Sequence, residues 1–140
     1  MKKVLVFGTF DGLHKGHLDF FCQAKEQGDF LIAVVARDSS AEQNKNKKPK
    51  YGEQERLKAV QECDFVNEAI LGTENHNLFN DPYDIIKEIN PDVVCLGYDQ
   101  AQFLDKLKAE LKRMNVPAQI KALKPYKPEI YRSSFLNKQF

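Results

Sequence analysis

Long hydrophobic segments are absent from this sequence. The apolar run nearest the N-terminus, Val4–Phe7, stops at Gly8 and is too short for a signal peptide or a membrane span. We therefore expect a cytoplasmic protein with no membrane partner. Cysteine is also scarce: Cys22, Cys63 and Cys95 are odd in number and none has the spacing of metal ligands. Such cysteines are typical of buried, reduced thiols.

An excess of charge of either sign is lacking as well. The 140 residues include 21 basic and 20 acidic side chains, for a formal net charge of +1. Proteins that bind nucleic acid usually carry a clear basic excess, so we expect no nucleic-acid partner. No internal repeat and no linker interrupts the chain, whose length fits one compact domain. We expect residues 1–140 to form that single domain.

Apolar runs alternate with stretches of helical periodicity along the chain. The predicted strands are Val4–Phe7, Phe30–Ala36, Phe65–Leu71, Asp92–Leu96 and Ala118–Leu123. The predicted helices are Gly16–Gln27, Gly52–Glu62, Asp81–Ile89 and Ala101–Met114. Strands that are apolar throughout suit a parallel sheet covered on both faces. The alternation predicts an α/β fold, a single Rossmann-like doubly wound domain with a five-stranded parallel sheet.

Two polar segments break this rhythm, and each follows a predicted strand. Ser39–Tyr51 is rich in lysine, and Lys124–Tyr131 contains two prolines and should be extended. In open α/β sheets, ligands bind beyond the carboxyl ends of the strands. Both segments are therefore well placed to contribute to a binding site.

The residues with the clearest chemical meaning lie between the first strand and the first helix, in the stretch GTFDGLHKGH at positions 8–17. A helix N-terminus offers free backbone N–H groups to an anion, and the glycines allow close approach of a ligand. His14 and His17 can both face a bound phosphate, where neutral imidazoles donate N–H bonds as charge builds in the transition state. The alternatives are a helix-cap pair or half of a metal site. With no other His or Cys cluster nearby, we expect no metal site built on these histidines and assign no residue as a metal ligand.

This stretch matches the GxFDxxHxGH signature of the cytidylyltransferase-like nucleotidyltransferases at every fixed position, and the resemblance covers nearly the whole chain. Within that superfamily the chain most resembles the archaeal-type FAD synthases, which are FMN adenylyltransferases. The supporting stretches are Val35–Ser39, Lys48-Pro49, Glu53–Arg56, Leu96–Gln100 and Arg132–Phe135. The glycerol-3-phosphate cytidylyltransferases are the nearest competitor. Their longer RTxGIST-type motif is reduced here to Arg-Ser-Ser, which weakens that alternative.

The resemblance implies that both signature histidines stabilise the transferring phosphoryl group. Lys48 would hold phosphate, and Asp11, Lys48 and Arg56 would bind the acceptor, with Asp11 near it or near a metal. The candidate catalytic residues are therefore His14, His17 and Lys48. For Lys48 the alternative is a solvated loop. For Arg56 it is a surface ion pair with Glu53, worth less than about 1 kcal/mol.

The resemblance also implies a nucleotide site. The candidate nucleotide-binding residues are Gly8, Thr9, Phe10, His14, His17, Gly97, Asp99, Arg132, Ser133 and Ser134. Asp99 would accept from the ribose hydroxyls, or it would cap the helix expected near Ala101. Ser133 and Ser134 would grip the β- and γ-phosphates at the start of a last short helix, or would only cap it.

The reaction that the resemblance implies is transfer of AMP from ATP to FMN, giving FAD and pyrophosphate. A phosphate monoester is already a nucleophile, so positioning and charge neutralisation would supply most of the acceleration. A divalent ion, Mg²⁺ by preference, would accompany the triphosphate with few protein ligands. The alternatives are a CTP-dependent transferase acting on glycerol 3-phosphate or another small phosphate, and a non-catalytic nucleotide-binding module. We expect a homodimer, as for many such enzymes.

Overall fold

The computed structural model describes residues 1–38, 50–72, 81–97, 100 and 103–124. The strands in these residues are β1 (Lys3–Gly8), β2 (Phe30–Val35), β3 (Glu68–Leu71), β4 (Val93–Leu96) and β5 (Gln119–Ala122). The helices are α1 (Lys15–Glu26), α3 (Glu53–Gln61), α4 (Asp81–Ile89) and α5 (Leu104–Arg113). The five strands and four helices predicted from the apolar pattern are present, in the predicted order. The last short helix expected at Ser133 and Ser134 lies outside the described residues.

Two elements, β3 and α5, begin three residues later than the sequence suggested. Before β3, the N–H of Val66 donates to the carbonyl of Cys63 over 3.1 Å. This hydrogen bond closes a turn where the sequence predicted the start of the strand. Pairing with β2 starts only at Glu68. Likewise α5 begins at Leu104 and its N-cap residue is Phe103, three residues after the predicted start of the α-helix.

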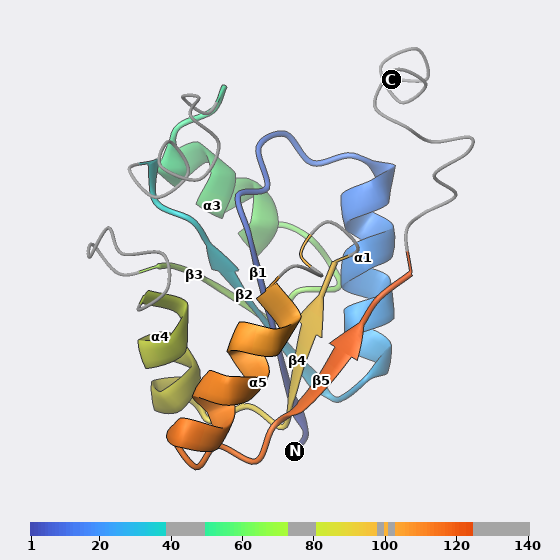
Figure 1. The fold of residues 1–140 in the computed structure, drawn as a ribbon. Coiled ribbons are helices and arrows are strands. Elements are labelled where there is room, and N and C mark those ends of the chain that lie inside the picture. Colours follow the sequence, from blue (N-terminus) through green and yellow to red (C-terminus); the bar gives the residue numbers. More distant parts are fainter. Residues whose placement is uncertain (39–49, 73–80, 98–99, 101–102, 125–140) are drawn as a thin grey trace.

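The sheet has the strand order β3-β2-β1-β4-β5, and all its neighbouring strands run parallel. The chain moves outward from β1 to β2 and β3, then returns to the other side of β1 for β4 and β5 (Figure 1). This confirms the predicted doubly wound, Rossmann-like parallel sheet. The order reverses between β1 and β4, which is where folds of this kind bind ligands.

Two apolar layers cover the sheet, one on each face. The layer beneath α1 and α3 includes Val4, Val6, Phe21, Ala24 and Val60. The layer beneath α4 and α5 includes Leu5, Ile86, Val94, Leu107 and Leu111. Alternate residues of β1 thus enter opposite layers, and α4 and α5 lie together on one side of the sheet (Figure 1). Burial on both faces explains why the central strands are apolar throughout.

Two of the three cysteines are buried in these layers. Cys63 and Cys95 are buried free thiols, as predicted, and burial raises the pKa of Cys95 to about 12. For Cys22 the prediction of burial is wrong, because its place on α1 leaves it half-exposed beside Glu26. None of the helices in the described ranges has the length and apolar character needed to cross a membrane.

Candidate active site

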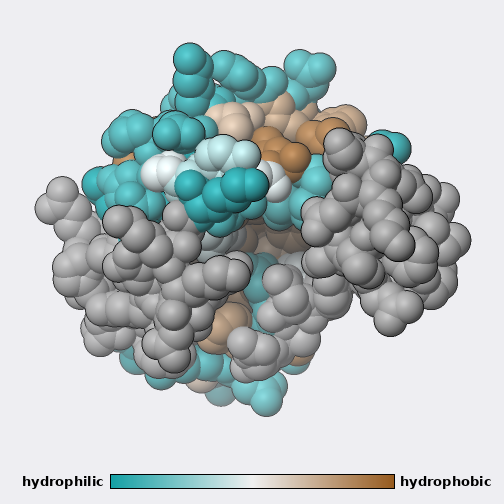
Figure 2. Space-filling model, turned by 90° about the horizontal axis from the view of Figure 1, so that it is seen from above, coloured by the Kyte–Doolittle hydropathy of each residue, from teal (hydrophilic) through white to brown (hydrophobic). Residues whose placement is uncertain are grey.

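The strands separate at the point where the sheet order reverses. β1 pairs with β2 along its whole length, from Lys3 to Gly8, whereas its register with β4 ends at Leu5 opposite Val94. The carboxyl ends of β1 and β4 therefore diverge. Figure 2 looks down on this edge of the molecule, where hydrophobic and hydrophilic residues of the described chain both reach the surface. The crevice outside the diverging strand ends is the usual ligand site of an open α/β sheet.

One side chain bridges the diverging strand ends. The amide of Gln100 accepts from the N–H of Gly97, after β4, over 3.0 Å and donates to the carbonyl of Phe7, in β1, over 2.9 Å. Both backbone groups lack a β1–β4 partner, because the pairing has already ended. Gln100 thus holds the crevice at a set width. Sequence reasoning placed this residue in a supporting stretch but gave it no role.

The loop after β1 turns sharply and folds onto the core. Phe10 has a φ of 53° and Gly12 a φ of 85°, both in the left-handed region. For Phe10 this conformation costs about 1–2 kcal/mol. Burial of its ring, worth about 1.5–3 kcal/mol, offsets the cost. The ring lies so close to Gly8 that a Cβ there would sit 2.7 Å from it, so the first signature glycine makes room for Phe10.

The two histidines form the start of α1. His14 is the N-cap residue, and its Nδ1 accepts from the N–H of Gly16 over 3.0 Å. His17 reaches back, and its Nδ1 accepts from the N–H of His14 over 3.3 Å. The pair is a capping box built from imidazoles. The helix-cap alternative considered for these residues is thus confirmed, and both caps use the Nδ1 atom of the imidazole.

The hydrogen bonds assign the tautomer of both rings. Because each Nδ1 accepts a hydrogen bond, the proton of each neutral ring is on Nε2, which makes Nε2 a donor. Burial lowers the pKa of His14 below its ordinary value of 6.5, which favours the neutral ring at pH 7. The rings are stacked with centroids 4.0 Å apart, so the two Nε2 atoms belong to one compact donor pair. A Cβ at Gly16 would lie 2.8 Å from the His14 ring, so this glycine gives the ring its place.

The signature acid binds backbone on the far side of the loop. The carboxylate of Asp11 accepts from the N–H of Lys50 over 2.8 Å and from that of Tyr51 over 2.9 Å. It thereby ties the residues just before α3 to the loop after β1. This geometry favours a positioning role for Asp11 over the direct contact with the acceptor or a metal that the resemblance implied.

Arg56 is buried, with only 1% of its surface exposed. Its Nε donates to the carbonyl of Tyr51 over 3.0 Å, and its Nη1 donates to those of Thr9 and Ala36 over 2.8 and 2.7 Å. Its Nη2 pairs with the carboxylate of Asp38 at 2.7 Å. The surface ion pair considered for Arg56 is therefore wrong. Its donors are largely used inside the protein, which favours a positioning role over contact with the acceptor.

Glu53 takes part in the same network with a different partner. Its carboxylate accepts from Arg37 Nη1 over 3.2 Å and from the N–H of Asp38 over 3.0 Å. Arg37 also donates through Nε to the carbonyl of Gly72, directly after β3, over 2.8 Å. These contacts join the ends of β2 and β3 to the start of α3. Sequence reasoning considered Glu53 only as an ion-pair partner of Arg56. It gave no role to Arg37, although a charged residue directly after an apolar strand was a signal.

Some of the predicted site residues lie together in the structure, and the others lie outside the residues that it describes. The predicted residues that lie around the β1–α1 loop are Gly8, Thr9, Phe10, Asp11, His14, His17 and Arg56. Gly97 joins them across the crevice through Gln100. The predicted site residues outside the described ranges are Lys48, Asp99, Arg132, Ser133 and Ser134. Within the described part of the chain, no three His, Cys, Asp or Glu side chains are grouped as a metal site requires.

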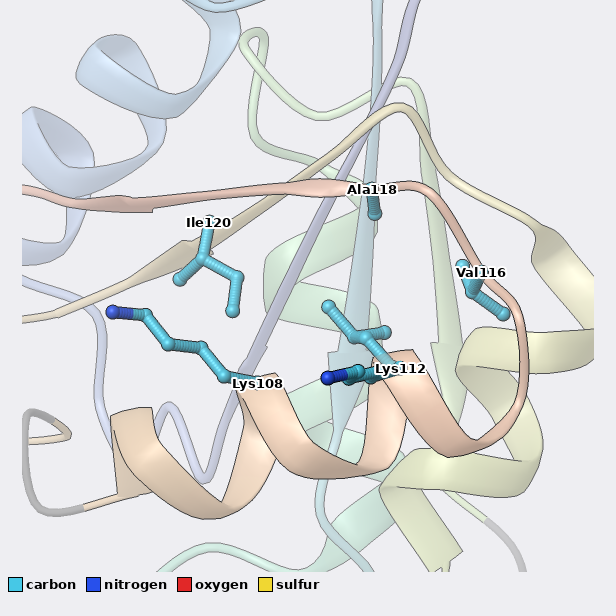
Figure 3. A pocket seen from close by; sticks show the side chains of 6 residues that line it. Lys108, Lys112, Val116, Ala118 and Ile120 are labelled. Atoms are coloured by element: carbon cyan, nitrogen blue, oxygen red, sulfur yellow. The ribbon is translucent and has the colours of Figure 1, made fainter.

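A separate cavity of about 340 Å³ lies between α5 and β5 (Figure 3). Its lining residues are Lys108, Leu111, Lys112, Val116, Ala118 and Ile120. Figure 3 shows both lysines on α5, with Lys108 near Ile120 and with Val116 on the loop between α5 and β5. None of the candidate site residues lines this cavity, so it has no evident part in the chemistry at the crevice.

Relatives of the chain share most of its length. FAD synthases from Thermococcus sibiricus, Methanosarcina mazei and Thermoplasma acidophilum are 36%, 41% and 37% identical to it. These matches cover 94%, 86% and 99% of this chain and 87%, 75% and 94% of the respective relatives. Identities of this size over most of both chains show that the chain and these relatives belong to a common family.

Solved structures agree on the architecture. A lipopolysaccharide core biosynthesis protein from Thermoplasma volcanium is 35% identical with a TM-score of 0.82, over 91% of this chain and 99% of that one. A pantoate-beta-alanine ligase from Francisella tularensis has a TM-score of 0.68 over 99% of this chain and 65% of its own. At 16% identity, this second likeness concerns the fold alone.

The family comparison covers the elements that build the crevice. The cytidylyltransferase-like family model matches residues 5–139, which include the loop after β1, the histidine pair and the Arg56 network. The match agrees with the parallel sheet order and with the signature at the start of α1. The chain belongs to the cytidylyltransferase-like family.

Proposed function

We propose that this chain is an FMN adenylyltransferase, an FAD synthase that transfers AMP from ATP to FMN and releases pyrophosphate. FAD synthases at 36–41% identity over most of the chain support this assignment. The observation that carries the chemistry is the stacked pair His14 and His17, whose Nδ1 atoms are used by the helix and whose Nε2 atoms are donors.

In this reaction an oxygen of the FMN phosphate attacks the α-phosphorus of ATP. A new P–O bond forms to that oxygen while the bond between the α-phosphorus and the bridging oxygen breaks, and pyrophosphate leaves with its electrons. The FMN phosphate needs no general base because it is already ionised at neutral pH. His14 and His17 donate from Nε2 to the α-phosphate oxygens, on which negative charge builds during the attack.

The nucleotide occupies the crevice between β1 and β4 in this proposal. Gly97 lines one side and the loop Gly8–Phe10 lines the other, with Gln100 joining Gly97 to Phe7, directly before that loop. By resemblance, Asp99 binds the ribose, and Arg132, Ser133 and Ser134 hold the β- and γ-phosphates. Lys48 binds phosphate between the two substrates and is the third catalytic group.

A divalent ion would be carried by the triphosphate, and Mg²⁺ is our proposal for it. Mg²⁺ keeps several waters and takes few protein ligands. Asp11 is the one carboxylate of the signature, and both its oxygens already accept backbone N–H groups, which fits an ion held mainly by phosphate oxygens. When bound, the ion would neutralise charge on the triphosphate. We place the reaction in the cytoplasm and within a single domain.

The decisive experiment is to incubate the purified protein with each triphosphate and each acceptor. We expect pyrophosphate with ATP and FMN, together with FAD in equal amount. Pyrophosphate only with CTP and glycerol 3-phosphate would replace this proposal with a cytidylyltransferase. No pyrophosphate with any pair would indicate a nucleotide-binding module.

A further inference from the structure

An exposed aromatic ring stands beside the signature loop. Tyr51 has 39% of its surface exposed and lies directly before α3, at the edge of the sheet where the strands have their carboxyl ends. The other exposed aromatic among the described residues, Phe65, is 37% exposed and lies between α3 and β3, at the opposite edge. Tyr51 is therefore the exposed aromatic of the described chain on the side of the crevice.

The backbone of Tyr51 is held from both sides. Its N–H donates to the carboxylate of Asp11 over 2.9 Å, and its carbonyl accepts from the buried guanidinium of Arg56 over 3.0 Å. Hydrogen bonds in which one partner is charged are shorter and stronger than those between neutral groups. The ring therefore projects from a fixed point.

The ring also packs against the loop between β1 and α1. A Cβ at Gly12 would lie 3.3 Å from the Tyr51 ring, so the ring edge rests on the backbone of Gly12, two residues before His14. Lys50 places its ammonium 5.6 Å from the ring centroid, and a cation–π contact at an exposed site is weak enough to yield to a ligand. An aromatic surface is thus prepared within reach of the histidine pair.

The position of Tyr51 determines which substrate it can meet. β1 lies between β4 on one side and β2 on the other, and the crevice for the nucleotide is on the β4 side. Tyr51 belongs to the β2 side, where the Arg56 network joins β1, β2 and α3. In-line attack brings the acceptor to the α-phosphorus from the side away from the leaving pyrophosphate. Because the nucleotide is assigned to the β4 side of β1, the β2 side is left for the acceptor, whose ring system can then reach Tyr51.

We propose that Tyr51 is the platform on which the isoalloxazine ring of FMN stacks, and that it thereby selects an aromatic acceptor over an aliphatic phosphate. This inference rests on the proposed FMN adenylyltransferase function. Stacking of a planar heterocycle on an aromatic side chain is favourable whatever groups the heterocycle carries at its edges. A ring held in advance also loses little freedom when the flavin binds.

The test compares FMN binding by the wild type and by Tyr51→Phe, Tyr51→Ala and Phe65→Ala, measured by equilibrium dialysis without ATP. We expect Tyr51→Ala to weaken FMN binding about tenfold, as loss of a stacked ring does. Tyr51→Phe keeps the ring and should stay within about twofold of the wild type. Phe65→Ala removes an equally exposed aromatic at the other edge and should change nothing.

Steady-state kinetics provide the second readout. Tyr51→Ala should raise the KM for FMN by a similar factor and leave the KM for ATP unchanged, because the nucleotide lies on the other side of β1. The backbone contacts of Tyr51 survive the substitution, and an unchanged melting temperature verifies this. Should Tyr51→Ala bind FMN as tightly as the wild type, the platform is refuted while the adenylyltransferase stands. If the wild type neither binds FMN nor forms FAD, both proposals fail.

Discussion

His14 and His17 divide two tasks between the two nitrogens of each imidazole. Nδ1 accepts a backbone N–H at the start of α1, as a serine or glutamate would in an ordinary capping box. Nε2 then carries the proton and can donate to phosphate. The structural bond thus sets the tautomer that the reaction needs, so the cap and the catalytic donor depend on one another.

Replacing His17 separates these tasks. We expect His17→Ala to lower kcat by about 100-fold or more, by analogy with the loss of an oxyanion donor. Glutamine is a natural third residue of a capping box, so His17→Gln should keep the melting temperature near that of the wild type and still lose activity. The measurements are kcat from FAD formation and thermal unfolding. Near-normal turnover in His17→Ala would remove this histidine from the mechanism.

Stability should depend on pH through His14. Burial lowers its pKa in the folded protein below 6.5, so the unfolded chain binds more protons in the range between the two pKa values. The contribution of His14 is therefore complete above about pH 7 and is lost as pH falls through 6.5 and the lowered folded pKa. Asparagine is a strong N-cap that does not titrate, so His14→Asn should reduce this loss. Urea unfolding at several pH values in this range gives the free energy of unfolding of the wild type and of His14→Asn. An equal dependence of this free energy on pH in both proteins would show that His14 is not the group responsible.

At the scale of the element, α3 is fastened to the sheet by a buried charge. The guanidinium of Arg56 reaches the carbonyls of Thr9 and Ala36, which follow β1 and β2, and the carboxylate of Asp38. A guanidinium suits this place because its planar fork can satisfy several acceptors at once. The start of α3, and Tyr51 with it, is thereby held against the loop that bears the histidines.

Removing this charge should destabilise the whole fold. Arg56→Met leaves buried carbonyls without donors, and we expect the free energy of unfolding to drop by about 3 kcal/mol or more. Arg113 is an exposed arginine paired with Glu110, and Arg113→Met should cost less than about 1 kcal/mol. Denaturant unfolding compares the two variants. A stable Arg56→Met protein with a raised KM for FMN would instead return Arg56 to the acceptor site.

At the scale of the whole molecule, the sheet is closed on one side of β1 and open on the other. β1 and β2 pair through to Gly8 and Val35, but β1 and β4 part after Leu5 and Val94. This asymmetry creates the crevice between the ends of β1 and β4. The amide of Gln100 satisfies the two backbone groups that the parting exposes.

Loss of this bridge should loosen the nucleotide side of the site. Gln100→Ala leaves the N–H of the buried Gly97 without its acceptor, and we expect a loss of about 1–3 kcal/mol in the free energy of unfolding. The KM for ATP should rise more than that for FMN, because the crevice lies between β1 and β4. Gln61→Ala is the matched control, since Gln61 makes one 3.4 Å bond to the carbonyl of Ala69. Equal effects of the two variants would mean that Gln100 has no special part in the site.

Features that depend on residues close together in the sequence were predicted well. The alternation of apolar runs and helical periodicity was enough for the five parallel strands and the helices between them, because burial on two faces imposes that pattern. The place of the histidine pair at a helix start was also predicted. Its hydrogen bonds join residues two or three positions apart, so they depend on local backbone alone.

Contacts between distant residues could not be predicted in this way. Arg56 meets Ala36 and Thr9 across 20 and 47 positions, Asp11 meets Tyr51 across 40, and Gln100 meets Phe7 across 93. Each depends on which strands are neighbours and where their register ends. The sequence by itself determined the fold class and the donor pair, since both follow from local pattern and short-range hydrogen bonding. Only the tertiary structure decided which charged side chains face the ligand and which support the loops that do, because strand order brings their partners together.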